Sequence, residues 1–163
     1  MYIDSTWGTP PNENIRAATE EAINGATGWN NAGDSTCSPQ PAKTGYFLKL
    51  VDQSVGQNLR DIIIKKGNTP GACAGNLLHE SGTKPDIITI RATAANVDRW
   101  RLVILIKHEI GHSLGLDNTP TATSCGFGDI MSIATDAASC VTPNDYAGYD
   151  IKSGDVGHEF GQS

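Results

Sequence analysis

The chain has no long apolar run and no excess of basic residues. Its longest apolar run, Leu102 to Ile106, ends at Lys107 and His108, whereas a membrane helix needs roughly 20 apolar residues. Lysine and arginine together number 12, aspartate and glutamate 18, and the formal net charge is −6. A chain of this charge lacks the cations that would neutralise a row of phosphates. We therefore expect a soluble protein that binds neither a membrane nor nucleic acid.

Charged residues are scarce as well, at 18% of the chain, which excludes a disordered polyelectrolyte. The 163 residues, 38% of them hydrophobic, are enough for one domain around one core. No internal repeat, low-complexity segment or linker divides the sequence. We expect a single, monomeric domain over residues 1–163.

Closely spaced cysteines are absent, since the four cysteines form no C-x-x-C pair. This spacing argues against a thiolate zinc knot and against a thioredoxin-like redox site. An even number of cysteines in a chain rich in Gly, Ser, Thr and Asn favours two disulfides, and hence export. The segment Met1–Thr6 has no secretory signal pattern. The chain is therefore either cytosolic or the processed form of a secreted, extracellular protein, and the cysteines favour the second.

Apolar periodicity and turn residues predict an α/β (α+β) domain. We expect strands over 2–4, 46–51, 61–66 and 85–91, with a short edge strand at 77–78. We expect helices over 13–31, capped by Asn12 or Asn14, over 97–114, and from 142 to 151. The three tryptophans are expected in or near the core: Trp7, Trp29 and Trp100.

The helix expected over 97–114 contains His108-Glu109-Ile110-Gly111-His112. Residues four apart share one face of a helix, so both imidazoles can reach one metal ion. Glu109 is turned about 100° around the helix axis from His108, where it can take a proton from a water molecule on the metal. Because the helix is otherwise mostly apolar, two histidines and a glutamate on it need a reason, and a catalytic zinc ion supplies one.

The motif continues as His108-Glu109-x-x-His112-x-x-Gly115, and Asp129-Ile130-Met131-Ser132 follows. In these residues the chain resembles the catalytic domain of the metzincin zinc endopeptidases, over about residues 2–151, with 152–163 as a tail. The resemblance implies a sharp turn at Gly115 out of the active-site helix and a Met-turn at Met131 beneath the metal. The segment from residue 142 is similar to matrixin-like members, and the cysteines around Met131 are similar to snapalysin.

The resemblance also implies a fold and a reaction. The fold is a twisted mixed sheet with an antiparallel edge strand, an active-site helix, a Met-turn and a C-terminal helix. The reaction is that of a secreted metalloendopeptidase, which hydrolyses peptide bonds with a zinc-bound water that Glu109 activates as general base. An extended protein or peptide substrate would pair with the edge strand, here around residues 74–78.

The third zinc ligand is where the chain departs from the family. Family members usually have histidine three residues beyond the glycine, or aspartate in snapalysin-like members, and this chain has Asn118 there. An amide oxygen is a weak zinc ligand, whereas Asp117 is a better one that comes one position early. His158 in the tail is a further alternative. Two histidines and a weak oxygen should hold zinc less tightly than three histidines.

Cys125 and Cys140 stand on either side of Met131. A disulfide between them would close a loop of about 15 residues and stabilise the fold by about 3 kcal/mol in the entropy model. Cys37 would then pair with Cys73. The sequence has no calcium loop of the form D-x-[DN]-x-[DN]-G, and calcium binding is left open.

Asn118 keeps a second hypothesis open, in which the chain is a metzincin-shaped binding or inhibitory module with weak or lost catalysis. Glu109 favours the enzyme, because a pure binding module has no need for a carboxylate beside the metal. The sequence therefore predicts a zinc endopeptidase first and a binding module second.

Overall fold

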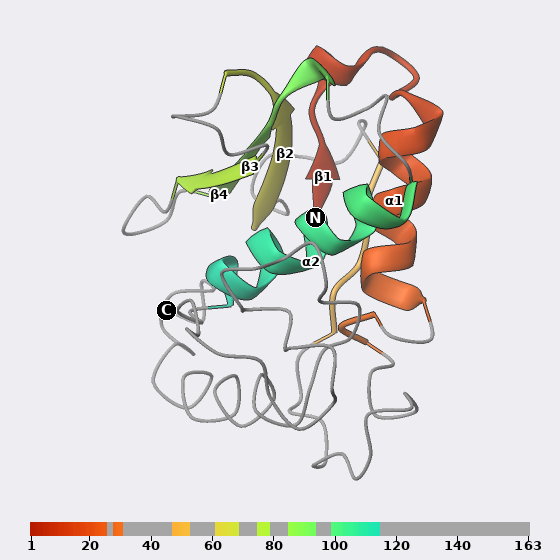
Figure 1. The fold of residues 1–163 in the computed structure, drawn as a ribbon, viewed down its shortest axis with the longest axis vertical. Helices are drawn as coiled ribbons and strands as arrows, with labels where there is room; N and C mark the ends of the chain where they lie inside the picture. Colours follow the sequence, from red (N-terminus) through yellow and green to blue (C-terminus); the bar gives the residue numbers. More distant parts are fainter. Residues whose placement is uncertain are drawn as a thin grey trace, which may run out of the picture.

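The computed structural model describes residues 1–25, 28–30, 47–52, 61–68, 75–78, 85–93 and 99–114. Its elements are, in chain order, β1 (Tyr2–Ile3), the 3-10 helix η1 (Ser5–Trp7), α1 (Glu13–Asn24), β2 (Ile62–Lys66), β3 (Gly75–Leu78), β4 (Asp86–Ile90) and α2 (Arg99–Ser113). They form a small mixed α/β fold, as the sequence predicts (Figure 1). Neither of the helices α1 and α2 is long and apolar enough to cross a membrane.

The described strands form one sheet in the order β1-β2-β4-β3. β1, β2 and β4 run parallel, and β3 runs antiparallel to β4. Ile63 of β2 pairs with Tyr2 on one side and with Ile87 on the other. The short strand predicted at 77–78 is confirmed over the longer range Gly75–Leu78, and it comes last in the order of the described strands.

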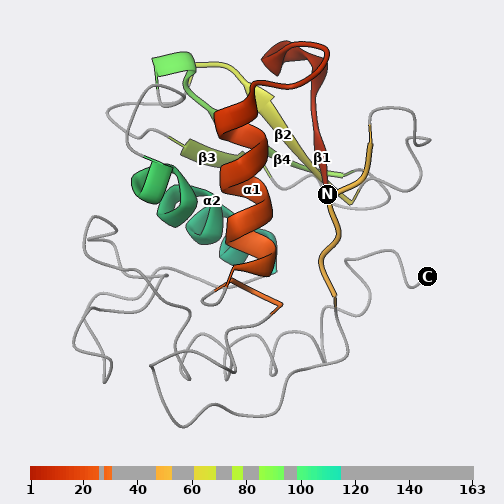
Figure 2. The same ribbon diagram turned by 90° about the vertical axis from the view of Figure 1, so that its right-hand side faces the viewer.

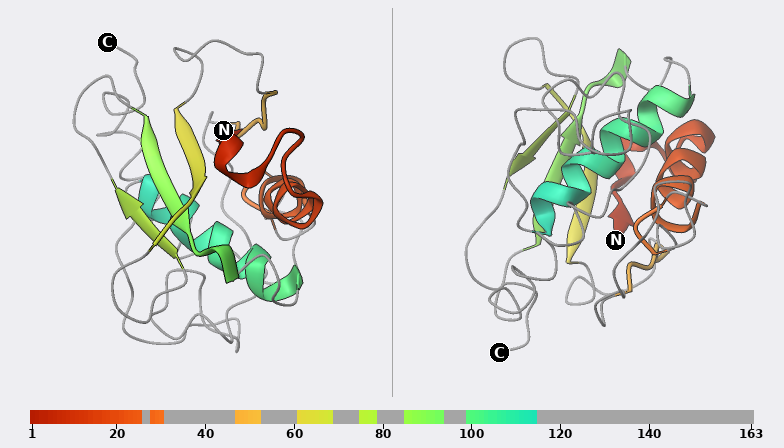
Figure 3. Two further views of the ribbon diagram at one scale, coloured as in Figure 1. Left: turned by 90° about the horizontal axis from the view of Figure 1, so that it is seen from above. Right: turned by 60° about the horizontal axis from the view of Figure 1, so that its bottom comes forward.

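One face of the sheet is covered by the two helices. Buried residues alternate with half-buried ones along β2 and β4, which is the pattern of a sheet with one covered face. Both helices lie on this face (Figure 3), with α2 crossing behind α1 in Figure 2. Their shared core contains Ile15, Ala18, Ala22, Ile23, Ile62, Ile64, Ile88, Ile90, Leu102, Ile106 and Ile110.

Helix α1 begins as predicted but ends earlier. The side-chain oxygen of Asn12 caps it by accepting hydrogen bonds from the backbone N–H groups of Asn14 and Ile15, at 3.0 and 3.3 Å. The prediction of a helix over 13–31 was wrong at its end, because the chain turns back after Asn24.

The backward turn depends on Gly28. The N–H of Trp29 donates to the carbonyl of Ala22 at 3.0 Å, so the returning chain lies against the helix end. A Cβ on Gly28 would stand 2.7 Å from the Ile23 carbonyl. Only glycine fits such a close approach of two backbones.

The strand predicted over 46–51 is also wrong for the described residues of that range. Residues 47–50 have no regular structure, and Val51 makes only an isolated parallel bridge with Tyr2. The Asn30 side chain bonds both backbone groups of Leu48, with distances of 2.7 and 2.9 Å. These side-chain bonds satisfy the backbone in place of a ladder.

The tryptophans follow the prediction in two cases of three. Trp7 and Trp29 are buried, with 6% and 5% of their surface exposed. Trp100 is 50% exposed and stacks instead with the guanidinium group of Arg101, 5.2 Å from the ring centre. The helix predicted from 142 to 151 and the tail 152–163 lie outside the described residues.

Candidate metal centre

Helix α2 carries the candidate site, and from Leu102 onward all its residues are buried or half-buried. Leu102, Ile106 and Ile110, spaced four apart, are fully buried against the core. Most polar residues of the second half are buried as well, with exposed fractions of 8% for His108 and 5% for Glu109. Polar side chains in such surroundings cost free energy unless they are paired or bind a ligand.

The two histidines of the motif meet one turn apart. Their Nε2 atoms are 3.1 Å apart, and the rings stand nearly perpendicular, at 86°, with centres 4.6 Å apart. Two nitrogens bound to one tetrahedral zinc ion lie about 3.3 Å apart, given zinc–nitrogen bonds of 2.0–2.1 Å. The pair therefore fits two positions of a zinc site with little movement. Without a cation, the same distance suits an N–H···N hydrogen bond between opposite tautomers.

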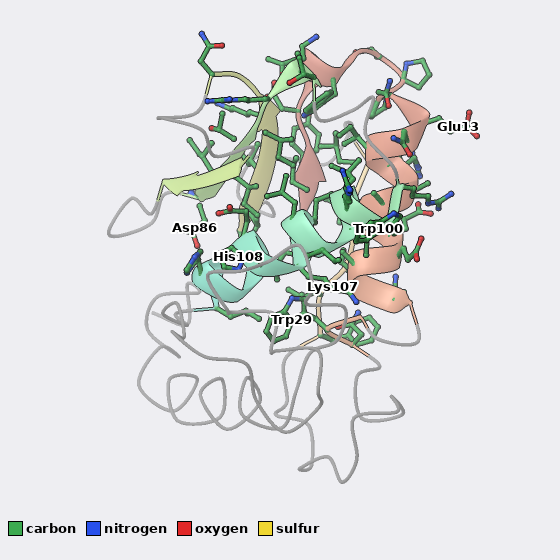
Figure 4. The ribbon with its side chains drawn as sticks, in the orientation of Figure 1. Glu13, Trp29, Asp86, Trp100, Lys107 and His108 are labelled. Atoms are coloured by element: carbon green, nitrogen blue, oxygen red, sulfur yellow. The ribbon has the colours of Figure 1, made fainter. Side chains whose placement is uncertain are left out.

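The site lies at the C-terminal half of α2. Figure 4 shows His108 and Asp86 at this end of the helix, remote from Glu13 on α1. His108 is buried and His112 is half-buried. The pair thus has one buried ring and one ring that is partly exposed to solvent.

Glu109, which directly follows His108 in the sequence, is buried. Burial removes water from its carboxylate and raises its pKa from 4.5 to about 7. A carboxyl group with this pKa can both accept and return a proton near neutral pH. This is the property that the predicted role of general base requires.

Lys107 precedes the histidines and is also buried, with 2% of its surface exposed. Burial lowers its pKa from 10.5 to about 8, and the negative charge of Glu21 on α1 opposes this change. The Lys107 carbonyl accepts a hydrogen bond from the indole nitrogen of Trp29 at 3.0 Å. This bond ties α2 to the segment that follows α1.

Asp86 and Ser113 form a contact that the sequence pattern does not predict. The Ser113 hydroxyl donates to Asp86 Oδ2 at 2.5 Å, and both residues are buried. Asp86 opens β4, and Ser113 is the last residue of α2. The only sequence signal is an acidic residue at the start of an apolar strand, which is too common to indicate a partner.

The other predicted site residues lie outside the described residues. They are the alternative third ligands Asn118, Asp117 and His158, the turn residues Gly115 and Met131, and the cysteines Cys37, Cys73, Cys125 and Cys140. Within the described part of the chain, no group of three or more His, Cys, Asp or Glu side chains is placed to hold a metal ion. The structure thus brings together His108 and His112, and the third ligand stays a prediction.

Comparison with known proteins does not assign the chain to a family. The chain matches no protein-family model and no curated protein at a significant level. Any functional assignment therefore depends on the site itself.

Proposed function

We propose that this protein is a zinc-dependent metalloendopeptidase of metzincin type, with His108 and His112 as two zinc ligands and Glu109 as general base. The observation that carries the proposal is the 3.1 Å separation of the two Nε2 atoms on adjacent turns of α2. Burial of Glu109 within the same turn supports it. The third ligand is proposed to be Asn118 or Asp117. The cysteine pattern supports a secreted, disulfide-bonded form.

The chemistry divides between the ion and the chain. Zinc, when bound, supplies a Lewis acid that polarises a peptide carbonyl and makes water more acidic. A carboxylate oxygen of Glu109 accepts the proton of the water that attacks the carbonyl carbon. As the carbon–nitrogen bond breaks, the same oxygen returns the proton to the leaving amine nitrogen. Burial raises the pKa of Glu109 to about 7 in the zinc-free chain, and the positive charge of a bound ion would favour the carboxylate form that accepts the first proton.

The sheet supports a protein or peptide as the substrate. Leu78, at the end of β3, pairs with Ile87, the neighbour of Asp86. Since Asp86 bonds Ser113 at the end of α2, this end of β3 and the last turn of α2 meet at one end of the sheet. An extended peptide that pairs with β3, the last strand in the order of the described strands, would pass close to the histidines.

The test is cleavage of casein by the full chain with the matched variants Glu109→Gln and Glu13→Gln. Loss of the general base should lower kcat/KM at least about 100-fold. Glu13 is exposed on α1, remote from His108 (Figure 4), so its variant should keep the parent's activity. A zinc chelator should abolish cleavage, and added zinc should restore it.

Two outcomes would contradict the proposal. Equal cleavage by Glu109→Gln and the parent would remove Glu109 from the mechanism. Zinc binding by the parent without cleavage of any protein or peptide substrate would favour the binding or inhibitory module.

A further inference from the structure

The end of α2 is attached to the sheet by a buried polar pair. Ser113 Oγ donates to Asp86 Oδ2 at 2.5 Å, with 2% of Ser113 and 5% of Asp86 exposed. The Asp86 backbone is itself fixed, because its N–H donates to the Asp61 carbonyl at 2.9 Å and the residue pairs with Ile62 of β2. The carboxylate therefore stands on a rigid strand and holds the hydroxyl of a helix end.

The last turn of α2 carries His112, so a contact that holds this turn in place also holds the His112 ring. The last carbonyl groups of a helix lack partners within the helix, and end turns open more readily than the middle. His108 lies in the body of α2, whereas His112 lies in the last turn, one residue before the helix ends at Ser113. Opening of that turn would move His112 away from His108.

We propose that Asp86 and Ser113 are positioning residues, whose hydrogen bond fixes the last turn of α2 so that the His112 ring meets the His108 ring at the separation a metal ion requires. Successive helical residues point about 100° apart. Ser113 thus contacts the sheet while His112 contacts His108, and fixing one sets the rotation of the other. This inference rests on the proposed function, since it assigns the pair a role in the same metal site.

If the bond between Asp86 and Ser113 only stabilised the fold, its loss would have different consequences from those of a positioning role. Loss of any buried hydroxyl that donates a hydrogen bond lowers the stability of a protein. The chain offers a matched control in Thr19, which is fully buried and donates its hydroxyl to the Ile15 carbonyl of α1 at 2.8 Å. A positioning role predicts that Ser113 and Thr19 variants differ in zinc affinity even when their stabilities are similar.

The experiment measures the zinc dissociation constant of the full chain by competition with a chromophoric chelator. Ser113→Ala should weaken zinc binding about tenfold, as loss of a group that orients a metal ligand does. Thr19→Val should stay within about twofold of the parent, because its hydroxyl supports α1. Urea unfolding of the zinc-free proteins gives the stability of each variant alongside.

Two variants of Asp86 test the same inference, so that the result does not depend on Ser113→Ala alone. Asp86→Asn keeps an oxygen that can accept from Ser113 and should retain tighter zinc binding than Asp86→Ala. With cobalt as the probe, the visible spectrum should change in Ser113→Ala and Asp86→Ala and stay like the parent's in Thr19→Val.

Three results would overturn the inference. Ser113→Ala that binds zinc as tightly as the parent would leave the pair with a structural role alone, and so would equal affinities for the two Asp86 variants. Failure of the parent chain itself to bind zinc would overturn the proposed function, and this inference with it, before any variant is compared.

Discussion

The indole nitrogen of Trp29 donates a hydrogen bond to the carbonyl oxygen of Lys107, 78 residues further along the chain, at 3.0 Å. Trp29 follows the end of α1, and Lys107 immediately precedes His108 on α2. Both residues are buried. The segment that turns back at Gly28 is therefore part of the packing that holds the histidine-bearing helix in place.

Replacing Trp29 should destabilise the protein. Trp29→Phe loses the hydrogen bond to Lys107 and part of a buried ring, and we expect the free energy of unfolding to fall by about 1–3 kcal/mol. Trp100→Phe is the matched control, because Trp100 is 50% exposed; it should change stability by less than about 0.5 kcal/mol. Urea unfolding measures both, and equal losses would contradict the role given to Trp29.

Both histidines of the pair should be necessary for zinc binding. His108→Ala and His112→Ala should each weaken zinc binding at least about 100-fold, since loss of a group that merely orients a ligand already costs 10–100-fold. Because the two rings serve one ion, the double variant should lose little more than either single variant. Titration with zinc gives the dissociation constants. Independent, additive losses would indicate two separate sites.

The third ligand should be found just beyond α2. We expect zinc affinity to fall in one of Asn118→Ala and Asp117→Ala and to stay unchanged in His158→Ala. If Asn118 is the ligand, Asn118→Asp should bind zinc more tightly than the parent, because a carboxylate is a better zinc ligand than an amide. Unchanged affinity in both alanine variants, together with a loss in His158→Ala, would move the third ligand to the tail.

The zinc-free protein should lose stability as the pH rises from 4.5 to about 7. Burial raises the pKa of Glu109 from 4.5 to about 7 in the folded chain. Below pH 4.5 Glu109 holds its proton in both the folded and the unfolded chain, so it does not lower the free energy of unfolding there. Within the window the unfolded chain ionises first, unfolding releases a proton, and the free energy of unfolding falls.

Glu109→Gln should remove this pH dependence, because an amide does not titrate. Glu13→Gln, on the exposed first turn of α1, should keep it. Urea unfolding in the presence of a chelator, repeated across the window, measures the slope for each protein. A Glu109→Gln protein with the parent's slope would show that another group causes it.

Local patterns in the sequence predict the parts of this fold that depend on neighbouring residues. The four-residue spacing of His108 and His112 is enough to place both rings on one face of a helix. The Asn12 cap and the apolar strands β2 and β4 follow from equally local signals. Each of these features is stabilised mainly by contacts within its own segment or by simple burial.

The features that the sequence does not predict depend on distant contacts. Asp86 meets Ser113 because the sheet register and the packing of α2 bring a strand start to a helix end. Residues 47–50 look like a strand by composition, yet the side chain of Asn30 takes the backbone bonds of Leu48. Similarly, α1 stops at Asn24 because the returning chain bonds its last turn.

The most direct test of the account is an anomalous difference map, recorded at the zinc absorption edge, from crystals grown or soaked with zinc. We predict one strong peak within bonding distance of the Nε2 atoms of both His108 and His112, with a third protein neighbour from Asn118 or Asp117. A map without a peak between these two nitrogens, from protein saturated with zinc, would contradict the metal centre and the peptidase built on it.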